Sequence, residues 1–482
     1  MDRRTFLAAG ASAVVSAAAA APARGGRPPN IVFVLADDLG WTDLSGWGSR
    51  YYRSPHLDRL GASGVRFTHG YSCGPNCAPT RGALLTGQYP VRNGIYTVGS
   101  IERFPWHTRP LRPVDNVEAL PPSKITVAEA LRDAGYVTGM FGKWHLGGGA
   151  SSPWRQGFDE AVVAEGAHYD FPTSPPCPDA RGRYLADFLT DRALDFIARH
   201  RSRPFFLYLP HFAVHSPHQA KEADIERFRG RPGVGGHRNP TYAAMIWSLD
   251  ESVGRVLASL REHGLERDTL VIFSSDNGGV GGYDREGIRG GGRVTDNAPL
   301  RGGKGMLTEG GIRVPWCFRW PGHIPAGAVC DAPIAIIDLF PTLLAAAGAA
   351  PPKDHVLDGV NLLPCLLSGG ASAPAREALY WHFPGYLGAA PGHWRTTPVG
   401  VIRRGRWKLM EWFEDGRVEL YDLRTDPGER RNRAAEEPRV VRDLLGRLRA
   451  WRRQVRAPMP TPNRERESGR VAPDSPARAL VY

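Results

Sequence analysis

The sequence is poor in cysteine and, after its first residues, in long apolar runs. Six cysteines lie among 482 residues, which is too few for a disulfide framework in a chain of this length. They form no paired C-x-x-C set and no Cys/His spacing of a structural zinc site. No apolar run after residue 26 is long enough to cross a membrane as a helix. The sequence therefore excludes a disulfide scaffold, leaves one or two disulfide bridges open, and predicts a soluble mature protein.

The composition is that of a folded globular chain, with 42% hydrophobic and 23% charged residues, and it excludes disorder throughout. The formal net charge is +12, and residues 439–482 contain 11 arginines against four acidic residues. A basic tail can bind nucleic acid or an anionic surface, but a solvated charged helix is the more common meaning. We therefore expect no nucleic-acid partner, with polyanion binding by this tail as a weaker alternative.

Residues 1–26 have the order of an export signal. Arg3 and Arg4 precede an apolar, alanine-rich run that ends in small residues, and the paired arginines favour the twin-arginine route. A short membrane anchor is the alternative, but the run is too weakly apolar to span a bilayer comfortably. We expect a periplasmic or secreted protein without stable membrane insertion, which meets the twin-arginine export machinery only transiently.

Strand and helix patterns alternate along the first 376 residues. Continuous apolar runs at 30–36 and 269–275 predict buried strands, and the apolar segments within 136–149 and 204–218 resemble them. Helical spacing at 125–136 and 184–200 lies between these runs. The alternation predicts an α/β domain with a mostly parallel sheet, whose ligands bind beyond the carboxyl ends of the strands. All four strand-like segments run into polar residues at that end.

The pattern changes near residue 377. Two short alternating stretches, 399–412 and 417–423, are joined by the turn-like FEDG, and 440–455 form an amphipathic helical pattern. We predict a catalytic domain at 27–376 and a small antiparallel α+β subdomain at 377–458. Residues 459–482, rich in Pro, Arg, Ser and Glu, are predicted to be disordered.

Cys77 opens the most informative motif. Cys77, Pro79 and Arg81 fit the pattern C-x-P-x-R. Cys73 is followed by the proline but lacks the arginine. The residues after Cys77 predict a helix that ends near Gly87, and a helix N-terminus with a cationic Arg81 one turn on favours a bound anion. The same surroundings could instead lower the pKa of the thiol and produce a nucleophilic cysteine.

The chain resembles the type I sulfatases, in the branch that includes arylsulfatase A-like and N-acetylgalactosamine-6-sulfatase-like enzymes. The resemblance extends from Asn30 to about Ala435. It rests on GKWHLG, SSDNGG, PLRGGKGMLTEGGIRVP, IDLFPTLLAAAG and ELYDLRTDPGE, and on Cys77, Pro79, Arg81, Leu85, Thr86 and Gly87. It implies an alkaline-phosphatase-like α/β sandwich around a mostly parallel central sheet, with a small C-terminal subdomain. It also implies that a formylglycine-generating enzyme oxidises Cys77 to formylglycine (3-oxoalanine), the catalytic residue of the family.

Two pairs of polar residues end the two predicted buried strands. Their carboxylate and amide oxygens suit Ca²⁺ or Mg²⁺, although turns and helix caps also use such residues. The resemblance implies that all four hold one Ca²⁺, with Mg²⁺ the less favoured ion. These residues are Asp37, Asp38, Asp276 and Asn277.

Three cationic or basic residues complete the anion site that the resemblance implies. Lys143 and His145 lie two residues apart, so in an extended segment they face the same way. The resemblance implies that they contact the sulfate and the formylglycine hydroxyl, with Arg81 beside them. Lys304 lies among glycines that permit close approach, and the resemblance implies that it bridges the sulfate and the catalytic residue. A phosphate-cradling loop is a weaker alternative because no Walker pattern is present, and Arg301 nearby fits a structural role equally well.

Three histidines compete within 204–218. The resemblance selects His215 as the histidine that binds sulfate on the leaving-group side, with His218 as the second choice. His211 fits a structural role beside its apolar strand. Further candidates for the substrate pocket are Trp41, Asp43, His382 and His393, for which a structural role is the more common one.

The resemblance implies hydrolysis of O-sulfate esters, of sulfated carbohydrates and of aryl sulfates. In it, a hydroxyl of hydrated formylglycine attacks sulfur, His215 or Lys304 supplies a proton to the alcohol, and His145 assists sulfate release. A phosphonate or phosphate monoester hydrolase on the same scaffold is the nearest alternative. The other alternative is a non-catalytic protein that binds sulfated glycans, with Cys77 unmodified or bridged to Cys73. Glycan specificity would be set by the loops at 99–115, 167–183, 278–297 and 383–397. The sequences of these loops do not indicate which glycan is bound.

Overall fold

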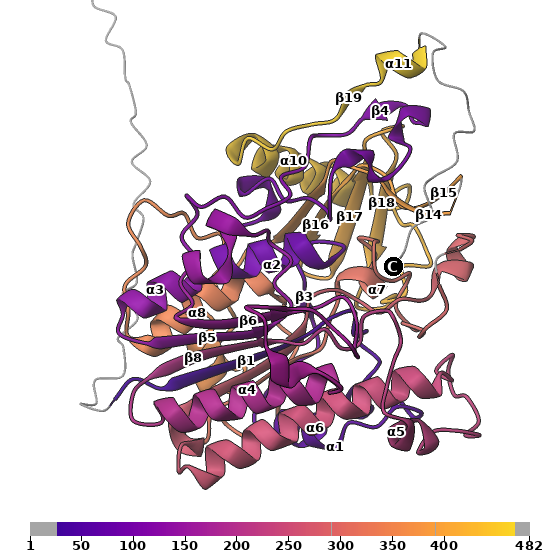
Figure 1. Ribbon diagram of the computed structural model, residues 1–482. Coiled ribbons are helices and arrows are strands. Elements are labelled where there is room, and N and C mark those ends of the chain that lie inside the picture. The colour runs from indigo at the N-terminus through magenta and orange to yellow at the C-terminus, as the bar shows by residue number, and fades with distance from the viewer. Residues whose placement is uncertain (1–26, 291, 391, 468–482) are drawn as a thin grey trace, which may run out of the picture.

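A mixed, mostly parallel sheet forms the centre of the computed structural model, which describes residues 27–290, 292–390 and 392–467 (Figure 1). Within these residues, nine strands lie in the order β11-β2-β10-β9-β1-β8-β5-β6-β7. Their bounds are β1 Asn30–Ala36, β2 Val65–Phe67, β5 Val137–Gly142, β6 Glu160–Ala164, β7 Thr173–Ser174, β8 Phe205–Pro210, β9 Thr269–Ser275, β10 Trp316–Arg319 and β11 Ala328–Cys330. β10 and β7 run antiparallel to their neighbours, and the other pairings are parallel. The predicted parallel α/β core is confirmed, while the predicted export signal lies outside the described residues.

β1 occupies the middle of the sheet and pairs in parallel with β8 and β9. Every residue of β1 is buried, which explains why its sequence is continuously apolar rather than alternating. Successive side chains of a strand point to opposite faces, and the two faces of β1 enter two separate hydrophobic cores. One core receives Ile31, Phe33 and Leu35, and the other receives Val32, Val34 and Ala36.

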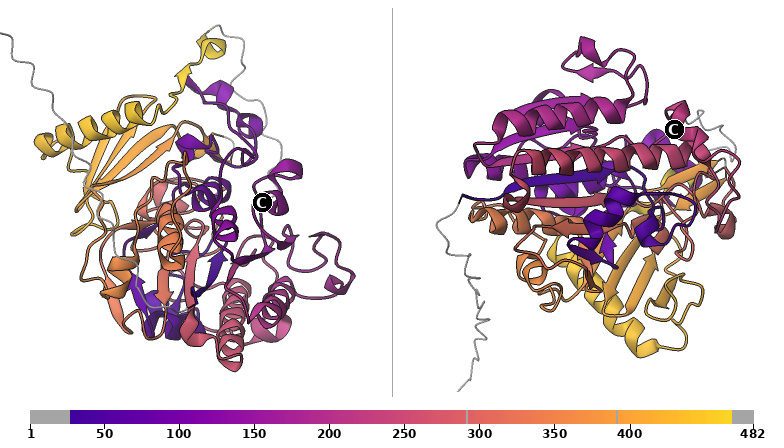
Figure 2. Two further views of the ribbon diagram at one scale, coloured as in Figure 1. Left: turned by 90° about the vertical axis from the view of Figure 1, so that its left-hand side faces the viewer. Right: turned by 90° about the horizontal axis from the view of Figure 1, so that it is seen from below.

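Helices cover both faces of the sheet (Figures 1 and 2). α1, α4, α5 and α6 lie on one face, and α2, α3 and α8 lie on the other. Their bounds are α1 Pro55–Ala62, α2 Cys77–Thr86, α3 Val127–Asp133, α4 Leu185–His200, α5 Glu222–Glu226, α6 Pro240–Glu262 and α8 Leu339–Ala347; the short α7 is Glu309–Ile312 and α9 is Leu363–Leu367. No helix of the described residues is both long and apolar enough to cross a bilayer. This three-layer arrangement is the α/β sandwich that the sequence predicts.

A second, antiparallel sheet packs on the α2 side of the molecule (Figure 2). It has the order β13-β16-β17-β18 and is covered by α10 Pro438–Gln454. Its strands are β13 Leu379–Phe383, β16 Val399–Arg404, β17 Trp407–Trp412 and β18 Val418–Asp422. The FEDG turn joins β17 to β18, with Gly416 at a φ of 70°, as the sequence predicts. Buried residues of this sheet and of α10 belong to the same hydrophobic core as those of α2 and α8.

Three further pairings have two strands each, and two of them join segments that are distant in the sequence. β3 Gly70–Tyr71 pairs with β12 Ile334–Ala335, and β14 Leu387–Ala390 pairs with β15 His393–Thr396. β4 Leu111–Arg112 pairs with β19 Thr461–Pro462. The prediction of disorder from residue 459 is therefore wrong for the start of that segment. The Asn463 side chain donates to the backbone oxygens of His107 and Arg109, both at 2.9 Å, and α11 Arg464–Glu467 follows.

Candidate active site

The parallel strands bring the predicted polar residues to one edge of the sheet. Asp37 and Asp38 follow β1, Asp276 and Asn277 follow β9, and Lys143 follows β5. Because these strands run in the same direction, their carboxyl ends meet. Asp38 and His145 adopt φ angles of 61° and 57°, in the left-handed region that few non-glycine residues occupy.

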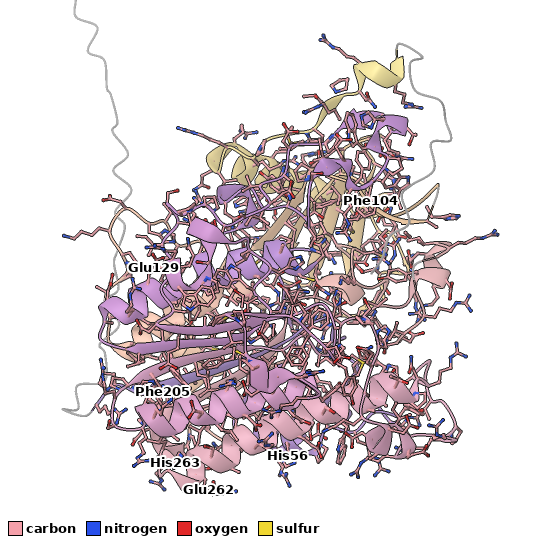
Figure 3. The ribbon with its side chains drawn as sticks, viewed as in Figure 1. His56, Phe104, Glu129, Phe205, Glu262 and His263 are labelled. Atoms are coloured by element: carbon pink, nitrogen blue, oxygen red, sulfur yellow. The ribbon has the colours of Figure 1, made fainter. Side chains whose placement is uncertain are left out.

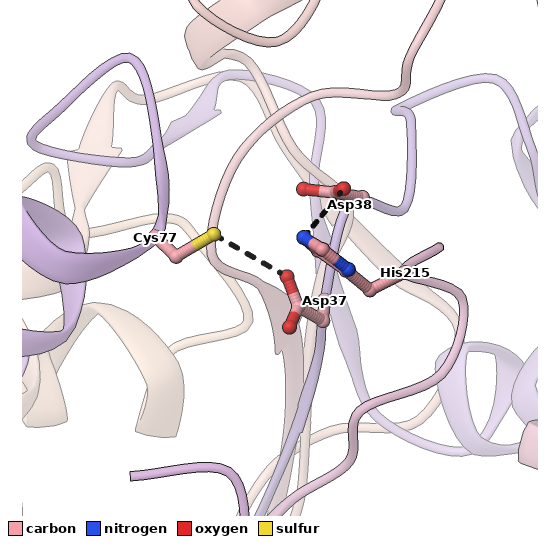
Figure 4. A group of neighbouring side chains, drawn as sticks. All are labelled: Asp37, Asp38, Cys77 and His215. Atoms are coloured by element: carbon pink, nitrogen blue, oxygen red, sulfur yellow. Dashed lines mark hydrogen bonds and ion pairs between the residues drawn. The ribbon is translucent and has the colours of Figure 1, made fainter. Parts of the chain in front are cut away.

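Cys77 is the first residue of α2 and is 1% exposed. Its Sγ lies 3.5 Å from Asp37 Oδ1 (Figure 4) and 3.5 Å from Lys143 Nζ. Gly87, with a φ of 64°, ends the helix as predicted. Burial and the Asp37 carboxylate raise the pKa of the Cys77 thiol to about 12, despite the nearby Lys143 and Lys304. The alternative prediction of a low-pKa, nucleophilic thiol is therefore wrong, because burial and Asp37 outweigh the two nearby lysines.

All six cysteines are free in the described part of the chain. Cys73 and Cys77 form no disulfide, nor do Cys317 and Cys330. Instead, the Sγ atoms of Cys330 and Cys365 lie 3.9 Å apart in the core. The sulfur of Cys77 thus faces the carboxylates rather than another thiol.

Arg81 lies one turn into α2 and is fully buried. Its Nε and Nη2 donate to Asp276 Oδ2 at 3.0 and 2.8 Å, and its Nη1 donates to the backbone oxygen of Lys143 at 2.9 Å. Arg81 Nη2 is also 3.5 Å from Asp37 Oδ2. The guanidinium therefore holds the start of α2 against the ends of β1, β5 and β9.

The four predicted metal ligands form a connected, buried group. The backbone N–H of Asp38 donates to Asp276 Oδ1 at 3.2 Å, and Asn277 Nδ2 donates to Asp38 Oδ1 at 2.8 Å. Asn277 Oδ1 is buried without a hydrogen-bond partner. Asp37, Asp38, Cys77 and His215 each place one ligand atom within 4.8 Å of the others (Figure 4). Three carboxylates with an unsatisfied amide oxygen match the hard-oxygen donor set of Ca²⁺ or Mg²⁺, so the residues present fit a divalent cation.

The carboxylates of this group depend on nearby cations. Burial alone would raise the pKa of Asp37, but Lys143, His215 and Arg81 hold that pKa well below its ordinary value. Burial and the charge of Asp37 raise the pKa of Asp276 to about 7. A divalent cation would relieve this crowding of negative charge.

Two lysines approach the carboxylates from different loops. Lys143 Nζ lies 2.5 Å from Asp37 Oδ2, and Lys304 Nζ lies 2.8 Å from Asp38 Oδ2. The Lys304 backbone N–H donates to Gly279 O at 3.0 Å, and the next residue, Gly305, donates to Pro75 O at 2.7 Å. The glycine-rich loop is therefore tied directly to the loop that precedes Cys77.

The structure separates the three competing histidines. His215 Nε2 lies 3.6 Å from Asp38 Oδ2, while its Nδ1 is 2.7 Å from Ser216 O and so acts as the donor there. His211 is buried behind the site, with Nε2 2.9 Å from Ser252 Oγ. His218 packs edge-on to the Tyr242 ring. His215 is therefore the histidine that lies beside the Asp38 carboxylate. Burial, together with Lys304 and Lys143, lowers the pKa of His215 to about 4.

A cavity of about 420 Å³ opens beside Cys77. Lys143, His145, His215 and Lys304 line it. Burial, with Lys143 and Arg81, lowers the pKa of His145 well below its ordinary value. Five of the predicted catalytic residues therefore share one cavity, while Arg81 is buried and does not line it.

The weaker pocket candidates are not among the described residues that line this cavity. Asp43 is buried and accepts hydrogen bonds from Tyr242 and Thr295. Trp41 stacks under the Arg313 guanidinium at 4.4 Å. The other three contact neighbouring loops or strands: His382 Nε2 lies 2.8 Å from Pro458 O, His393 Nδ1 accepts from Arg289 N, and Arg301 pairs with Glu286.

Sequence reasoning missed three charged residues that line the cavity. They are Arg103, Glu165 and Arg395. Arg103 and Arg395 lie within two of the loops that we expect from the sequence to set specificity. Their place in these loops was the one sequence feature that pointed to them. Their convergence on Cys77 depends on tertiary packing and has no local pattern.

The family comparison is decisive once this geometry is known. Residues 29–349 match the sulfatase family model, and residues 303–454 match the model of the C-terminal region of N-sulphoglucosamine sulphohydrolase. The chain belongs to the sulfatase family. It is thus a sulfatase enzyme, a hydrolase of sulfate esters.

Known proteins agree with this assignment. The sulfatase is 38% identical over 383 residues to N-acetylgalactosamine-6-sulfatase of Canis lupus familiaris, covering 74% of this chain and 69% of the relative. It is 33% identical to a sulfatase of Formosa agariphila, with 90% of each chain covered. Among solved structures, Ps i-CgsB in complex with k-i-k-neocarrahexaose matches with a TM-score of 0.74 and 28% identity, over 88% of this chain and 93% of that chain. The phosphonate monoester hydrolase of Agrobacterium radiobacter shares the fold, with a TM-score of 0.62 at 22% identity over 89% and 96% of the two chains.

Proposed function

We propose that this sulfatase hydrolyses O-sulfate esters of sulfated carbohydrates, and aryl sulfates in vitro, by means of a formylglycine made from Cys77 and one bound Ca²⁺. The observation that carries the proposal is the position of Cys77 at the N-terminus of α2. Its sulfur is 3.5 Å from both Asp37 and Lys143, beside a cavity lined by further cations. Carbohydrate substrates are supported by the names of two similar proteins, an N-acetylgalactosamine-6-sulfatase and a protein in complex with k-i-k-neocarrahexaose.

Two groups would complete this chemistry. Formylglycine at position 77 would supply, as its hydrate, one hydroxyl for attack on sulfur and a second that permits release of sulfate. Asp37, Asp38, Asp276 and Asn277 would hold a Ca²⁺, which would supply positive charge that offsets the sulfate oxygens.

The remaining steps belong to side chains of the chain itself. Lys143 and Lys304 place two ammonium groups beside the position of Cys77, where they offset the negative charge of a bound sulfate. Arg81 orients Asp276 and the backbone of Lys143 through three hydrogen bonds. The site is thereby preorganised before a substrate enters.

Side chains that line the cavity can transfer the protons. His215 donates from Nδ1 to Ser216 O, so its Nε2 is the atom that exchanges a proton with the substrate. The pKa of Lys304 is raised, since Asp38 outweighs burial, so Lys304 enters the reaction protonated and can supply a proton to the leaving alcohol. His145, whose depressed pKa keeps it neutral, can accept a proton from the hydroxyl at position 77.

The proposal includes export. The paired arginines of residues 1–26 support passage through the twin-arginine machinery to the periplasm or beyond. Because that route carries folded proteins, a formylglycine-generating enzyme would act on Cys77 before export.

The test compares 4-nitrophenyl sulfate, phosphate and a matched phosphonate as substrates for the Ca²⁺-loaded protein co-expressed with a formylglycine-generating enzyme. We expect the sulfate to be the preferred substrate, Cys77→Ala to abolish turnover, and Cys73→Ala to retain it. Cys73 is a matched control because it is buried four residues away and does not line the cavity. A dominant phosphonatase or phosphatase activity would favour the alternative enzyme on the same fold. Binding of sulfated sugars without turnover by modified protein would favour a non-catalytic role.

A further inference from the structure

Two buried thiols lie together beneath the edge of the central sheet. Cys330 ends the edge strand β11, Cys365 lies in α9, and neither lines the cavity beside Cys77. Their Sγ atoms are 3.9 Å apart. Since a disulfide holds its two sulfur atoms about 2.0 Å apart, closure requires an approach of about 1.9 Å. Rotation of the two side chains can supply a movement of this size.

The backbone holds the two cysteines against each other. A Cβ added to Gly370 would lie 2.9 Å from Cys330 Cβ and 3.1 Å from its Sγ, and one added to Gly369 would lie 3.5 Å from Ala328 Cβ. Gly370 has a φ of 92°, and its N–H donates to Cys365 O at 2.8 Å. The turn after α9 therefore folds back onto β11, and this close approach requires glycine at position 370.

The contact between the two thiols makes them chemically unequal. The hydrogen bond from Cys365 lowers the pKa of Cys330 to about 7, and the same contact raises the pKa of Cys365. Both lie just beneath the surface, because Val329 is 53% exposed and Leu367 is 39% exposed. The thiolate is the form of cysteine that attacks a disulfide. Cys330 is therefore the thiol that reacts first with an oxidant.

The segment between the two cysteines, residues 331–364, holds the end of α2. The N–H of Asp358 donates at 2.9 Å to the oxygen of Gly87, the residue that ends this helix. α8 lies within the segment and packs against α2 and α3, whose Glu129 is labelled in Figure 3. Because α2 begins at Cys77, a bond that closes this segment into a loop restrains the neighbours of the helix that carries the proposed reactive residue.

We propose that Cys330 and Cys365 form a disulfide bond when the protein meets an oxidising environment, and that this bond stabilises the folded chain. The Cys330 thiolate attacks a disulfide oxidant such as oxidised glutathione, breaks its S–S bond, forms a mixed disulfide and releases one thiol. Cys365, after loss of its proton, attacks the Cys330 sulfur and releases the second thiol. The two cysteines lose two electrons and two protons, which the oxidant takes up as it becomes two thiols.

The bond does not depend on formylglycine or on a bound metal. Disulfides persist in the periplasm and outside the cell, so the proposed export would bring the chain into a suitable compartment. Oxidation of the purified protein tests the bond whether or not the chain is exported.

The first test maps the bond in the full-length protein. Purified protein is incubated with oxidised glutathione, free thiols are alkylated under denaturing conditions, and the peptides are analysed without reduction. We expect the peptides of Cys330 and Cys365 as one joined species, lighter than their sum by two hydrogen atoms, with Cys317 alkylated. Alkylation of both Cys330 and Cys365, a glutathione left on Cys330, or a bond from either residue to another cysteine would overturn the proposal.

The second test measures the effect of the bond on stability. The two cysteines are 35 positions apart, and closure of a loop of this length should raise the Tm of oxidised wild-type protein by about 3–5 °C over that of reduced protein. Each variant is compared with itself in the two states, so the packing cost of a substitution cancels. Cys330→Ala and Cys365→Ala should each lose the difference.

Cys317→Ala is the matched control, because Cys317 is a buried cysteine in the hydrophobic core on the other face of the sheet. It should keep the full difference in Tm between oxidised and reduced protein. Equal Tm values for oxidised and reduced wild-type protein would contradict the stabilising role. A difference that survives in Cys330→Ala would assign the effect to another thiol and overturn the proposal.

Discussion

Arg81 donates hydrogen bonds from Nε and Nη2 to a single carboxylate oxygen of Asp276, at 3.0 and 2.8 Å. Both side chains are fully buried. One planar guanidinium thus joins the helix that begins at Cys77 to the strand end that carries two of the proposed metal ligands. The position of the reactive residue relative to the metal group depends on this contact.

Arg81→Lys keeps the charge but removes the planar two-donor geometry. We expect kcat/KM for an aryl sulfate to fall at least about a hundredfold, because loss of a positioned donor typically costs that much. Steady-state kinetics on protein with the same formylglycine content would measure it. The exposed Arg132→Lys on α3 is the control, and near-wild-type activity of Arg81→Lys would show that charge alone suffices.

Removal of the divalent cation should affect stability as well as activity. Chelation should abolish turnover, and added Ca²⁺ should restore it. Ca²⁺ should also stabilise the folded state by about 2.7 kcal/mol when its free concentration is about 100 times the Kd, which thermal unfolding detects as a higher Tm. Asp276→Asn should weaken this Ca²⁺-dependent rise. A Tm that is insensitive to Ca²⁺ in wild-type protein would argue against the metal group.

Lys304→Met should lower kcat more than it raises KM, because the ammonium group is placed to act on the departing alcohol and on charge formed in the transition state. The defect should be largest for esters of poorly acidic alcohols and smaller for 4-nitrophenyl sulfate, whose leaving group needs less protonation. Lys353→Met, an exposed change far from the cavity lining, should leave both constants unchanged. An equal defect for good and poor leaving groups would remove Lys304 from proton transfer.

A buried charge cluster below the glycine-rich loop should give a pH-dependent stability. Lys408 Nζ lies 3.0 Å from Glu309 Oε1 and 2.8 Å from Glu429 Oε1. Burial raises the pKa of Glu429 to about 7, although Lys408 opposes the shift. Between an unfolded pKa of about 4.3 and the folded value, the folded state binds the extra proton, so stability falls with pH by at most about 1.4 kcal/mol per unit.

Glu429→Gln mimics the protonated carboxyl and should remove this slope. We expect its Tm, relative to that of wild type, to rise between pH 5 and about pH 7 and to level off above that pH, as measured by calorimetry in matched buffers. A constant difference in Tm across that range would mean that Glu429 remains charged in the folded protein.

Much of this site could be predicted from the sequence because its residues follow strong local patterns. Asp37 and Asp276 end continuous apolar runs, and such runs form central parallel strands whose carboxyl ends converge. Cys77 begins a short helix with Gly87 at its end, and the structure has the helix there. Local patterns of this kind depend on neighbours in the chain.

Other features depend on contacts between distant segments and have no local pattern. Arg103 and Arg395 line the same cavity because the loop after residue 98 packs on the β14–β15 hairpin. The raised pKa of the Cys77 thiol follows from burial and from Asp37, which a helix N-terminus alone does not indicate. The pairing of Thr461–Pro462 with Leu111–Arg112 likewise gives order to a segment whose composition resembles a disordered tail.

Mass spectrometry of the peptide that contains residue 77 tests the catalytic proposal most directly. Protein co-expressed with a formylglycine-generating enzyme should yield this peptide about 18 Da lighter than the cysteine form, since an aldehyde replaces the thiol. The specific activity on an aryl sulfate should rise in proportion to the lighter fraction across preparations. Full activity in protein whose residue 77 is entirely unmodified cysteine would contradict the proposal.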